Sequence, residues 1–256
     1  MSQTFAPHPG AAPLPRMVAA QTAMETRLLL RNGEQLVLAV VIPLIVLVAG
    51  IYAAAHFDLT GSDPVQVLTP GVLALAVMST SFTSLAIATG FERRYGVLKR
   101  LGSSPLPRTG LLAGKVLALF AVQLVQFVVI GTVAALAGWR PELGPAGLVG
   151  AVLCVLTGTA AFAALGLLMA GMLRAEATLA AANLVYVVLL IGGGVVAPAS
   201  AYGEAGWVLE HLPSGALGSG LRDSLTAGHV PWLQIGVLVF WAALGGMLTA
   251  RTFKWE

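Results

Sequence analysis

The sequence predicts an all-α fold: a polytopic membrane protein with six transmembrane helices, an N-terminal interfacial helix and short re-entrant outer helices before the last span. Composition is the first reason, because 57% of the 256 residues are hydrophobic and only 10% are charged, where a soluble domain carries about 25% charged residues. The second reason is a series of apolar runs, each near the roughly 20 residues that cross a bilayer as a helix. Third, the charges gather between these runs, where water can reach them.

The N-terminal residues 1–15 are rich in Pro and Ala and contain no Lys or Arg, so we expect a disordered tail there. No signal peptide is expected. The first long apolar run begins only near Leu36, and no small-residue cleavage site follows it.

Residues 16–33 have the rhythm of an amphipathic helix that ends at Asn32-Gly33. One side of this helix would carry Met17, Ala20, Met24 and Leu28. The pattern predicts a helix lying in the membrane interface. The alternative is an ordinary lead-in to the first span.

Residues 34–256 are predicted to form one six-span membrane domain. The expected spans are approximately 36–55, 70–90, 114–138, 147–173, 178–198 and 232–250. The fifth contains a possible break or hinge at Gly192–Gly194.

The distribution of Lys and Arg predicts the orientation. All but two of the fourteen basic residues fall on one side of the predicted spans, leaving Arg140 and Arg222 on the other. Because Lys and Arg are retained in cytoplasmic loops, we expect both termini in the cytoplasm and the protein in the plasma (inner) membrane.

The loop 91–115 is the most basic part of the chain, with six basic residues. Its interior predicts a short helix over 92–101, in which Gly96 is the one helix breaker, then a turn at 102–105 and a return to the bilayer. We expect a cytoplasmic partner to dock here.

The segment 198–223 is too broken for a span and too apolar for a free loop. It predicts two short helices near 203–212 and 214–225, with Ser214 as a candidate cap of the second.

The polar candidates inside the spans are Gln123, Gln126 and Asn183. They could touch a substrate along a pathway, but such side chains more often bond neighbouring helices, which is the favoured interpretation. Ion-coupled transporters usually place Asp, Glu or His in the bilayer, so the absence of these residues from the predicted spans disfavours a secondary transporter.

Enzyme chemistry is not predicted. The nearest text to a P-loop, Gly110 to Val116, has the wrong spacing and lacks the Ser or Thr that would hold magnesium. The three aspartates, Asp58, Asp63 and Asp223, all lie outside the spans, and no Cys or His has metal-ligand spacing. We therefore expect no cofactor or metal in this chain. Nucleic-acid binding is not expected either, because no soluble face combines basic and aromatic residues.

Two segments carry a family resemblance. The pattern Glu92-Arg93…Gly96…Lys99-Arg100-Leu101…Pro105-Leu106-Pro107-Arg108…Gly114-Lys115 resembles the cytoplasmic loop of type-2 ABC transporter permeases. The outer segment is similar through Leu212-Pro213-Ser214 and Leu221-Arg222-Asp223. Within that family the chain resembles the drug and lipid exporters of the actinobacterial kind.

This resemblance implies a permease subunit that forms the substrate pathway as a homo- or heterodimer and is driven by separate ATPase subunits that hold ATP and magnesium. It implies ATPase coupling through Glu92, Arg93, Arg94, Gly96, Lys99, Arg100, Pro105 and Arg108. It also implies an outer gate segment that includes Leu212, Pro213, Arg222 and Asp223. Export, and not import, is the direction that the family implies.

Two other functions are compatible with the residues. One is a non-transport scaffold or sensor subunit that anchors a partner through the same basic loop, and the other is a secondary transporter. The substrate is open, since a hydrophobic drug, a lipid or a glycan precursor would all suit weakly polar spans.

Overall fold

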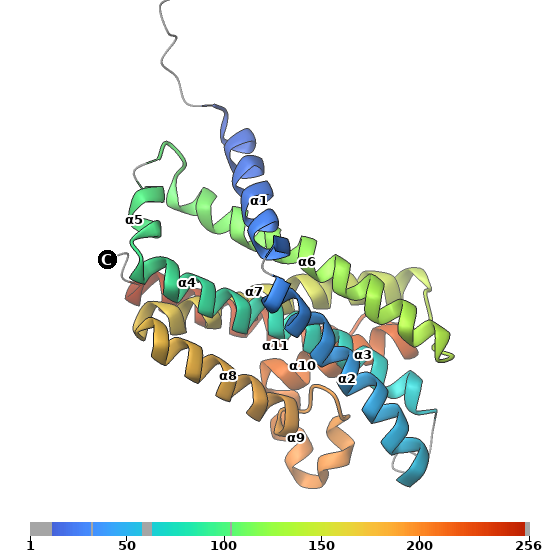
Figure 1. Ribbon diagram of the computed structural model, residues 1–256. Helices are drawn as coiled ribbons and strands as arrows, with labels where there is room; N and C mark the ends of the chain where they lie inside the picture. The colour runs from blue at the N-terminus through green and yellow to red at the C-terminus, as the bar shows by residue number, and fades with distance from the viewer. Residues whose placement is uncertain (1–11, 32, 58–62, 103, 254–256) are drawn as a thin grey trace, which may run out of the picture.

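The computed structural model describes residues 12–31, 33–57, 63–102 and 104–253, and these residues contain helices and no strands (Figure 1). Five helical segments are long and apolar enough to cross a membrane: Pro64–Arg94, Thr109–Leu136, Pro145–Met172, Ala175–Gly192 and Trp232–Thr252. The predicted all-α membrane fold is confirmed. The segment expected to be the first span lies in α2, but its described apolar part, Ala39–Ala53, is shorter than a span, so the count of six stays a prediction.

The elements follow one another in the order α1 (Leu14–Arg31), α2 (Gly33–Phe57), α3 (Pro64–Met78), η1 (Ser79–Ser84), α4 (Leu85–Arg94), α5 (Val97–Gly102), α6 (Arg108–Leu136), α7 (Pro145–Met172), α8 (Ala175–Gly192), η2 (Ala199–Ala205), α9 (Gly206–Glu210), α10 (Pro213–Thr226) and α11 (Trp232–Thr252). The predicted tail falls mostly on residues 1–11, which lie outside the described residues. The predicted fifth span is too long at its end, because α8 stops at the glycine run that begins at Gly192.

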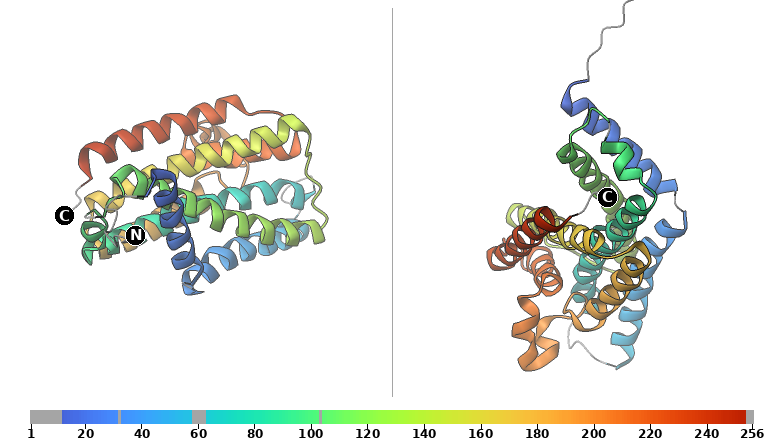
Figure 2. Two further views of the ribbon diagram at one scale, coloured as in Figure 1. Left: turned by 90° about the horizontal axis from the view of Figure 1, so that it is seen from above. Right: turned by 90° about the vertical axis from the view of Figure 1, so that its left-hand side faces the viewer.

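The second predicted span is the centre of the fold. It starts at Pro64, where the Asp63 carboxylate accepts a hydrogen bond from the Val65 N–H at 3.1 Å, as expected for a helix N-cap followed by proline. From there α3, the π-helical turn η1 and α4 run on as one helix, and its apolar window is the most buried of the five candidate spans. α2, α6, α7 and α8 pack against this helix, whereas α11 packs on α7 and α10 (Figure 2).

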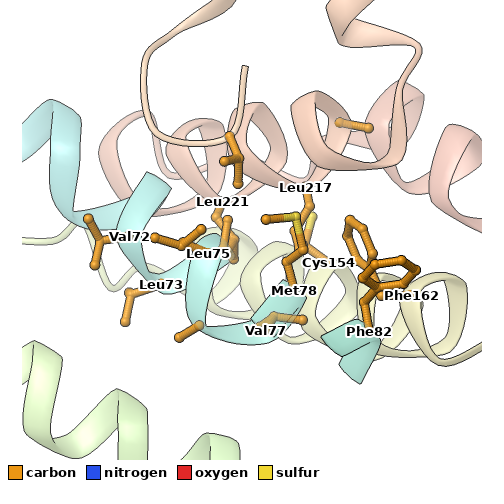
Figure 3. Close-up of a cluster of buried hydrophobic side chains, with 14 of the residues drawn as sticks. Val72, Leu73, Leu75, Val77, Met78, Phe82, Cys154, Phe162, Leu217 and Leu221 are labelled. Carbon is orange, nitrogen blue, oxygen red and sulfur yellow. The ribbon is translucent and has the colours of Figure 1, made fainter. Parts of the chain in front are cut away.

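The hydrophobic core joins α3, α7 and α10. Figure 3 shows Val72, Leu75 and Met78 of α3 facing side chains from α7 and α10. Close approach depends on small residues. A Cβ added at Gly158 of α7 would lie 2.7 Å from a methyl carbon of Leu217 in α10.

The outer segment folds as η2, α9 and α10. The predicted second helix is found as α10, but the predicted capping role of Ser214 is wrong. Leu212 is the N-cap residue, and the buried Ser214 hydroxyl instead donates to the Gly193 carbonyl at 2.8 Å. Because α10 packs on α3 and α7, α10 is part of the core, whereas α9 exposes Trp207 and Val208.

Helix α1 crosses the spans instead of running along them (Figure 2, left). It packs mainly on α6, and the face that it buries there carries Gln21 and Glu25. Of the predicted apolar stripe, Ala20, Met24 and Leu28 are exposed. The polar side of α1 therefore faces the protein and its apolar side faces outward.

Candidate coupling site at the basic end

The basic end is the end of the bundle at which α1, the end of α4, α5, the start of α6 and the turn between α7 and α8 meet (Figure 1). The single helix predicted over 92–101 is wrong in one respect, because the chain breaks at Gly96. This glycine has φ +68°, a left-handed conformation that side-chain-bearing residues rarely adopt. The break turns α5 away from α4, and Leu98 and Leu106 are buried on either side of the following turn.

A buried ionic triad links three elements of the basic end. The Lys115 ammonium of α6 donates to Glu25 Oε1 of α1 at 2.9 Å and to Glu92 Oε1 of α4 at 2.6 Å. Gln21 Nε2 adds a hydrogen bond to Glu25 Oε1 at 2.8 Å. Lys115 is only 5% exposed, and buried charges of this kind need partners. The triad therefore ties α1 and α4 to the start of α6.

Two further details show how tightly the triad is packed. A Cβ at Gly114 would lie 2.6 Å from Gln21 Cγ, so α1 rests directly on the α6 backbone. The other carboxylate oxygen of Glu92, Oε2, is buried and has no hydrogen-bond partner among the described residues. Glu92, predicted to contact an ATPase, thus contacts Lys115 inside the protein.

Sequence reasoning missed the triad. A signal was present, because Gln21 and Glu25 are four residues apart on the helix and Lys115 stands inside an expected span. A lysine at the end of an apolar run calls for a buried partner. Nothing in the sequence indicated that this partner would come from α1.

Arg93 and Arg94 connect α4 to the turn between α7 and α8. The Arg93 guanidinium donates to the carbonyls of Gly171 and Leu173, each at 2.6 Å. These carbonyls belong to the end of α7, where helix carbonyls lack intrahelical partners and a cation is favourable. Arg94 forms an ion pair with Glu176 in the first turn of α8 and lies 5.7 Å from the centre of the Tyr95 ring.

The remaining predicted contact residues form an exposed surface. We define the coupling surface as Tyr95, Val97, Lys99, Arg100 and Pro105, all of which are exposed. Tyr95 is 64% exposed and places an aromatic ring next to the Arg94 guanidinium on this surface. The side chain of Arg108 lies outside the described part of the chain. Three of the predicted coupling residues, Glu92, Arg93 and Arg94, are bonded to the spans and form an inner group. Lys99, Arg100 and Pro105 belong to the coupling surface, and Gly96 forms the break between the two groups. Tyr95 and Val97 of the coupling surface were not predicted.

The predicted outer-gate residue Arg222 is buried at the opposite end. Its Nη2 donates to the carbonyls of Val195 and Val196 at 2.8 and 2.6 Å, and its Nε donates to Val67 at 3.3 Å. Burial lowers the pKa of the Arg222 guanidinium to about 10, so it stays charged at neutral pH. Gly71 lies next to the Val195 and Val196 carbonyls, and a Cβ added at Gly71 would come within 2.7 Å of both.

The other predicted gate residues lie along the same helix. Leu212 and Pro213 start α10, and Asp223 Oδ2 accepts from Gln234 Nε2 of α11 at 3.2 Å. Through Ser214 and Arg222, α10 holds the irregular backbone that follows α8 at two points. The segment predicted as a gate is thus bonded directly to the broken end of the fifth predicted span.

The predicted pathway residues do not come together. Gln123 Nε2 donates to Ser81 Oγ at 2.8 Å and to Thr159 Oγ1 at 3.1 Å. Gln126 Nε2 donates to the Ala39 carbonyl at 2.8 Å, and its Oε1 accepts from Thr80. Both glutamines are buried and bond neighbouring helices around the π-helical turn, which is the alternative that the sequence favoured.

Asn183 differs from the two glutamines. It is exposed on the outer face of α8, next to the exposed Leu184. Among the residues that the structure describes, no group of three or more His, Cys, Asp or Glu side chains could hold a metal ion.

Comparison with known proteins shows which family this chain belongs to. The sequence profile of the ABC-2 type transporter membrane family matches residues 18–225, from α1 to the end of α10. The chain is also 26% identical over 175 residues to a protein of Bacillus subtilis (strain 168) named "Putative transport permease YvfS", covering 68% of this chain and 71% of that one. No solved structure gives a significant match. With its multiple membrane-spanning helices and this family match, the chain belongs to the ABC-2 type transporter family and is a multi-pass transport permease.

Proposed function

We propose that this protein is the permease subunit of an ATP-driven exporter, and that separate ATPase subunits, which hold ATP and magnesium, dock on the coupling surface. The observation that carries the proposal is that the basic end contains both an exposed surface and charged residues bonded to the spans. The coupling surface, with two cations and one aromatic side chain, follows the inner group in the chain, and the inner group is bonded to the spans. A partner that pushes on the surface would move the inner group with it.

The inner group distributes such a push over several helices. Glu92 connects α4 to α6 and α1 through Lys115, Arg93 connects it to the end of α7, and Arg94 connects it to the start of α8. The bonds of Glu92 and Arg93 are short and partly buried, whereas the Arg94–Glu176 pair is exposed. α4 cannot move alone without breaking the buried bonds. Energy supplied from outside would therefore tilt α4, α6, α7 and α8 together.

We place the basic end in the cytoplasm and the protein in the inner membrane, with both termini cytoplasmic. The asymmetry of Lys and Arg supports this orientation. The exposed apolar stripe of α1 supports a position in the membrane interface, with the polar face turned to the triad. In this arrangement α2 is the first of six spans.

A second permease, identical or related, would complete the pathway. The described parts of α2 and α8 expose apolar side chains at helical spacing. These are Val41, Ile45, Val48 and Tyr52 on α2, and Leu184, Val187, Val188 and Ile191 on α8. Asn183 lies beside the second stripe near the middle of α8, where a polar group facing only lipid is costly. We propose that these faces meet the partner permease and that Asn183 faces the substrate path.

The buried Arg222 supports a gating role for α10. Its bonds to the carbonyls of Val195 and Val196 hold the outer end of the pathway closed while α8 is at rest. A tilt of α8 would strain these bonds and displace α10 from α3.

The test is ATP hydrolysis in nanodiscs with the ATPase co-expressed. Reversing the charge of the exposed residues in a Lys99→Glu, Arg100→Glu variant should abolish co-purification of the ATPase and leave the spans inserted. The control is Glu204→Lys, a charge reversal at an exposed position of η2. ATPase capture at undiminished strength by the double variant would refute docking on this surface, and capture of a partner without nucleotide hydrolysis would favour a scaffold.

A further inference from the structure

An apolar groove of about 510 Å³ runs between α6 and α7. Its floor is made by Leu73 of α3 and by Leu221 and Leu225 of α10. Its walls include Leu124 and Phe127 of α6 and Val152 and Val155 of α7. The volume lies within the range of roughly 300–1,000 Å³ found for small-ligand sites.

The groove exists because α6 and α7 are consecutive spans that barely touch. Helix α6 packs on α1 and α3, whereas α7 packs on α11 and α10. The loop between them keeps the two helices apart at the end opposite the basic end (Figure 2, left). In a bilayer the open side of the groove faces the acyl chains. An apolar site at this depth favours a hydrocarbon occupant, because water gains no hydrogen bonds there.

Two polar side chains line the groove. Gln123 of α6 is hydrogen-bonded to Ser81 and Thr159, so its polar atoms already have partners in the protein. The other is Trp139, in the loop between α6 and α7. Trp139 lines the groove, and its Nε1 is buried without a hydrogen-bond acceptor among the described residues. A buried indole N–H normally finds an acceptor. The backbone here is fixed to α3, since Gln66 Nε2 donates to the Gly138 carbonyl at 3.1 Å and Gln66 Oε1 accepts from the Arg140 N–H at 3.2 Å.

Charge at this end indicates the head group. Arg140 stands between two groove-lining residues, Trp139 and Leu143, and its exposed side chain has no ion pair within the described part of the chain. Glu142 is also exposed. A guanidinium and a carboxylate two residues apart complement a head group that carries a phosphodiester and an amine.

We propose that the groove is a binding site for a zwitterionic phospholipid of the phosphatidylethanolamine type. One acyl chain fills the space between α6 and α7, and the phosphate accepts hydrogen bonds from Arg140 and Trp139 Nε1. The bound lipid bridges two spans that make little direct contact. The site is separate from the coupling surface and from the exposed face of α8, and it does not depend on ATPase docking.

Photo-crosslinking tests the proposal on the full chain in nanodiscs of galactosyldiacylglycerol, which has no phosphate, with a trace of phosphatidylethanolamine bearing a diazirine in its acyl chain. Label should map to the α6 and α7 residues of the groove. Val152→Phe fills the groove and should reduce this label by about tenfold or more. Val149→Phe is the matched control, because Val149 is on the same helix, is 51% exposed against 49% for Val152, and does not line the groove.

Head-group recognition is tested by competition. Unlabelled phosphatidylethanolamine should displace the label, whereas diacylglycerol, which has the same chains and no phosphate, should compete about tenfold less well. Arg140→Gln, a loop substitution that leaves the spans unchanged, should remove that difference. Equal labelling of the Val152→Phe and Val149→Phe variants would overturn the proposal. So would equal competition by diacylglycerol.

Discussion

Replacing Lys115 by Met removes the ammonium group that binds both Glu25 and Glu92 and keeps a side chain of similar length. The substitution leaves two carboxylates facing each other in a buried site without their cation. Gln21 still donates to Glu25, but Glu92 Oε1 loses its hydrogen bond from Lys115, and Glu92 Oε2 already has no partner among the described residues. We expect α1 to separate from α6, since α1 carries one of the two unpaired charges.

The size of this effect follows from the burial of the triad. Removing one partner of a buried ion pair costs about 3–5 kcal/mol. Because about 1.4 kcal/mol corresponds to a factor of ten, the opening equilibrium of α1 should shift by between about one hundred-fold and a few thousand-fold. Neutralising all three groups, in a Glu25→Gln, Glu92→Gln, Lys115→Met variant, should recover most of the loss, because it leaves no buried charge without a partner.

Hydrogen exchange of the α1 amides in nanodiscs measures this equilibrium directly. Protection should fall in the Lys115→Met variant and return in the triple variant. Lys99→Met is the matched control, because Lys99 is exposed on α5 and should leave α1 protection unchanged. Unchanged protection of α1 in the Lys115→Met variant would refute the claim that the triad holds this helix. Equal losses in the Lys115→Met and triple variants would show that packing, and not charge pairing, is responsible.

Three further predictions concern the opposite end. Gly71→Ala should lower the free energy of unfolding by about 1–3 kcal/mol, because the new Cβ would come within 2.7 Å of two backbone carbonyls. The control, Gly236→Ala, has open space around it and should be neutral or slightly stabilising. Equal effects of the two substitutions on thermal unfolding would contradict the packing argument. Arg222→Met should leave the Val195 and Val196 carbonyls without their donor, and we expect faster leak of a small membrane-impermeant fluorescent dye through the resting transporter. A leak rate equal to that of the unsubstituted protein would remove Arg222 from the gate. Burial raises the pKa of the Asp223 carboxyl, so its ionisation opposes folding as the pH rises through the pKa of the unfolded state and on through that of the folded state. Asp223→Asn should therefore raise the unfolding temperature at pH 7 and have little effect below about pH 4. The same difference in unfolding temperature at both pH values would exclude titration as the cause.

The hydropathy pattern alone determined the class of fold and the approximate positions of the spans. The physical reason is the bilayer, which forces the backbone of an apolar run to satisfy its hydrogen bonds within a helix. Four predicted spans, over 70–90, 114–138, 147–173 and 232–250, fall within or close to helices of the structure. The family was also predictable, because the motifs of loop 91–115 and of the segment around Leu212 lie in contiguous stretches of sequence.

Which polar residue faces a partner was decided by the tertiary structure. Arg93 and Lys99 are both basic residues of the loop 91–115, and hydropathy does not distinguish them. Arg93 nevertheless binds the end of α7 while Lys99 is exposed, because the left-handed turn at Gly96 separates them. Gln123 and Asn183 are both polar residues within apolar helices, but only the glutamine meets hydroxyl groups on neighbouring helices. Lys115 and Glu25 are 90 residues apart. Hydropathy reports only how polar each residue is, whereas these pairings depend on which helix faces lie opposite each other, and that requires the packed arrangement.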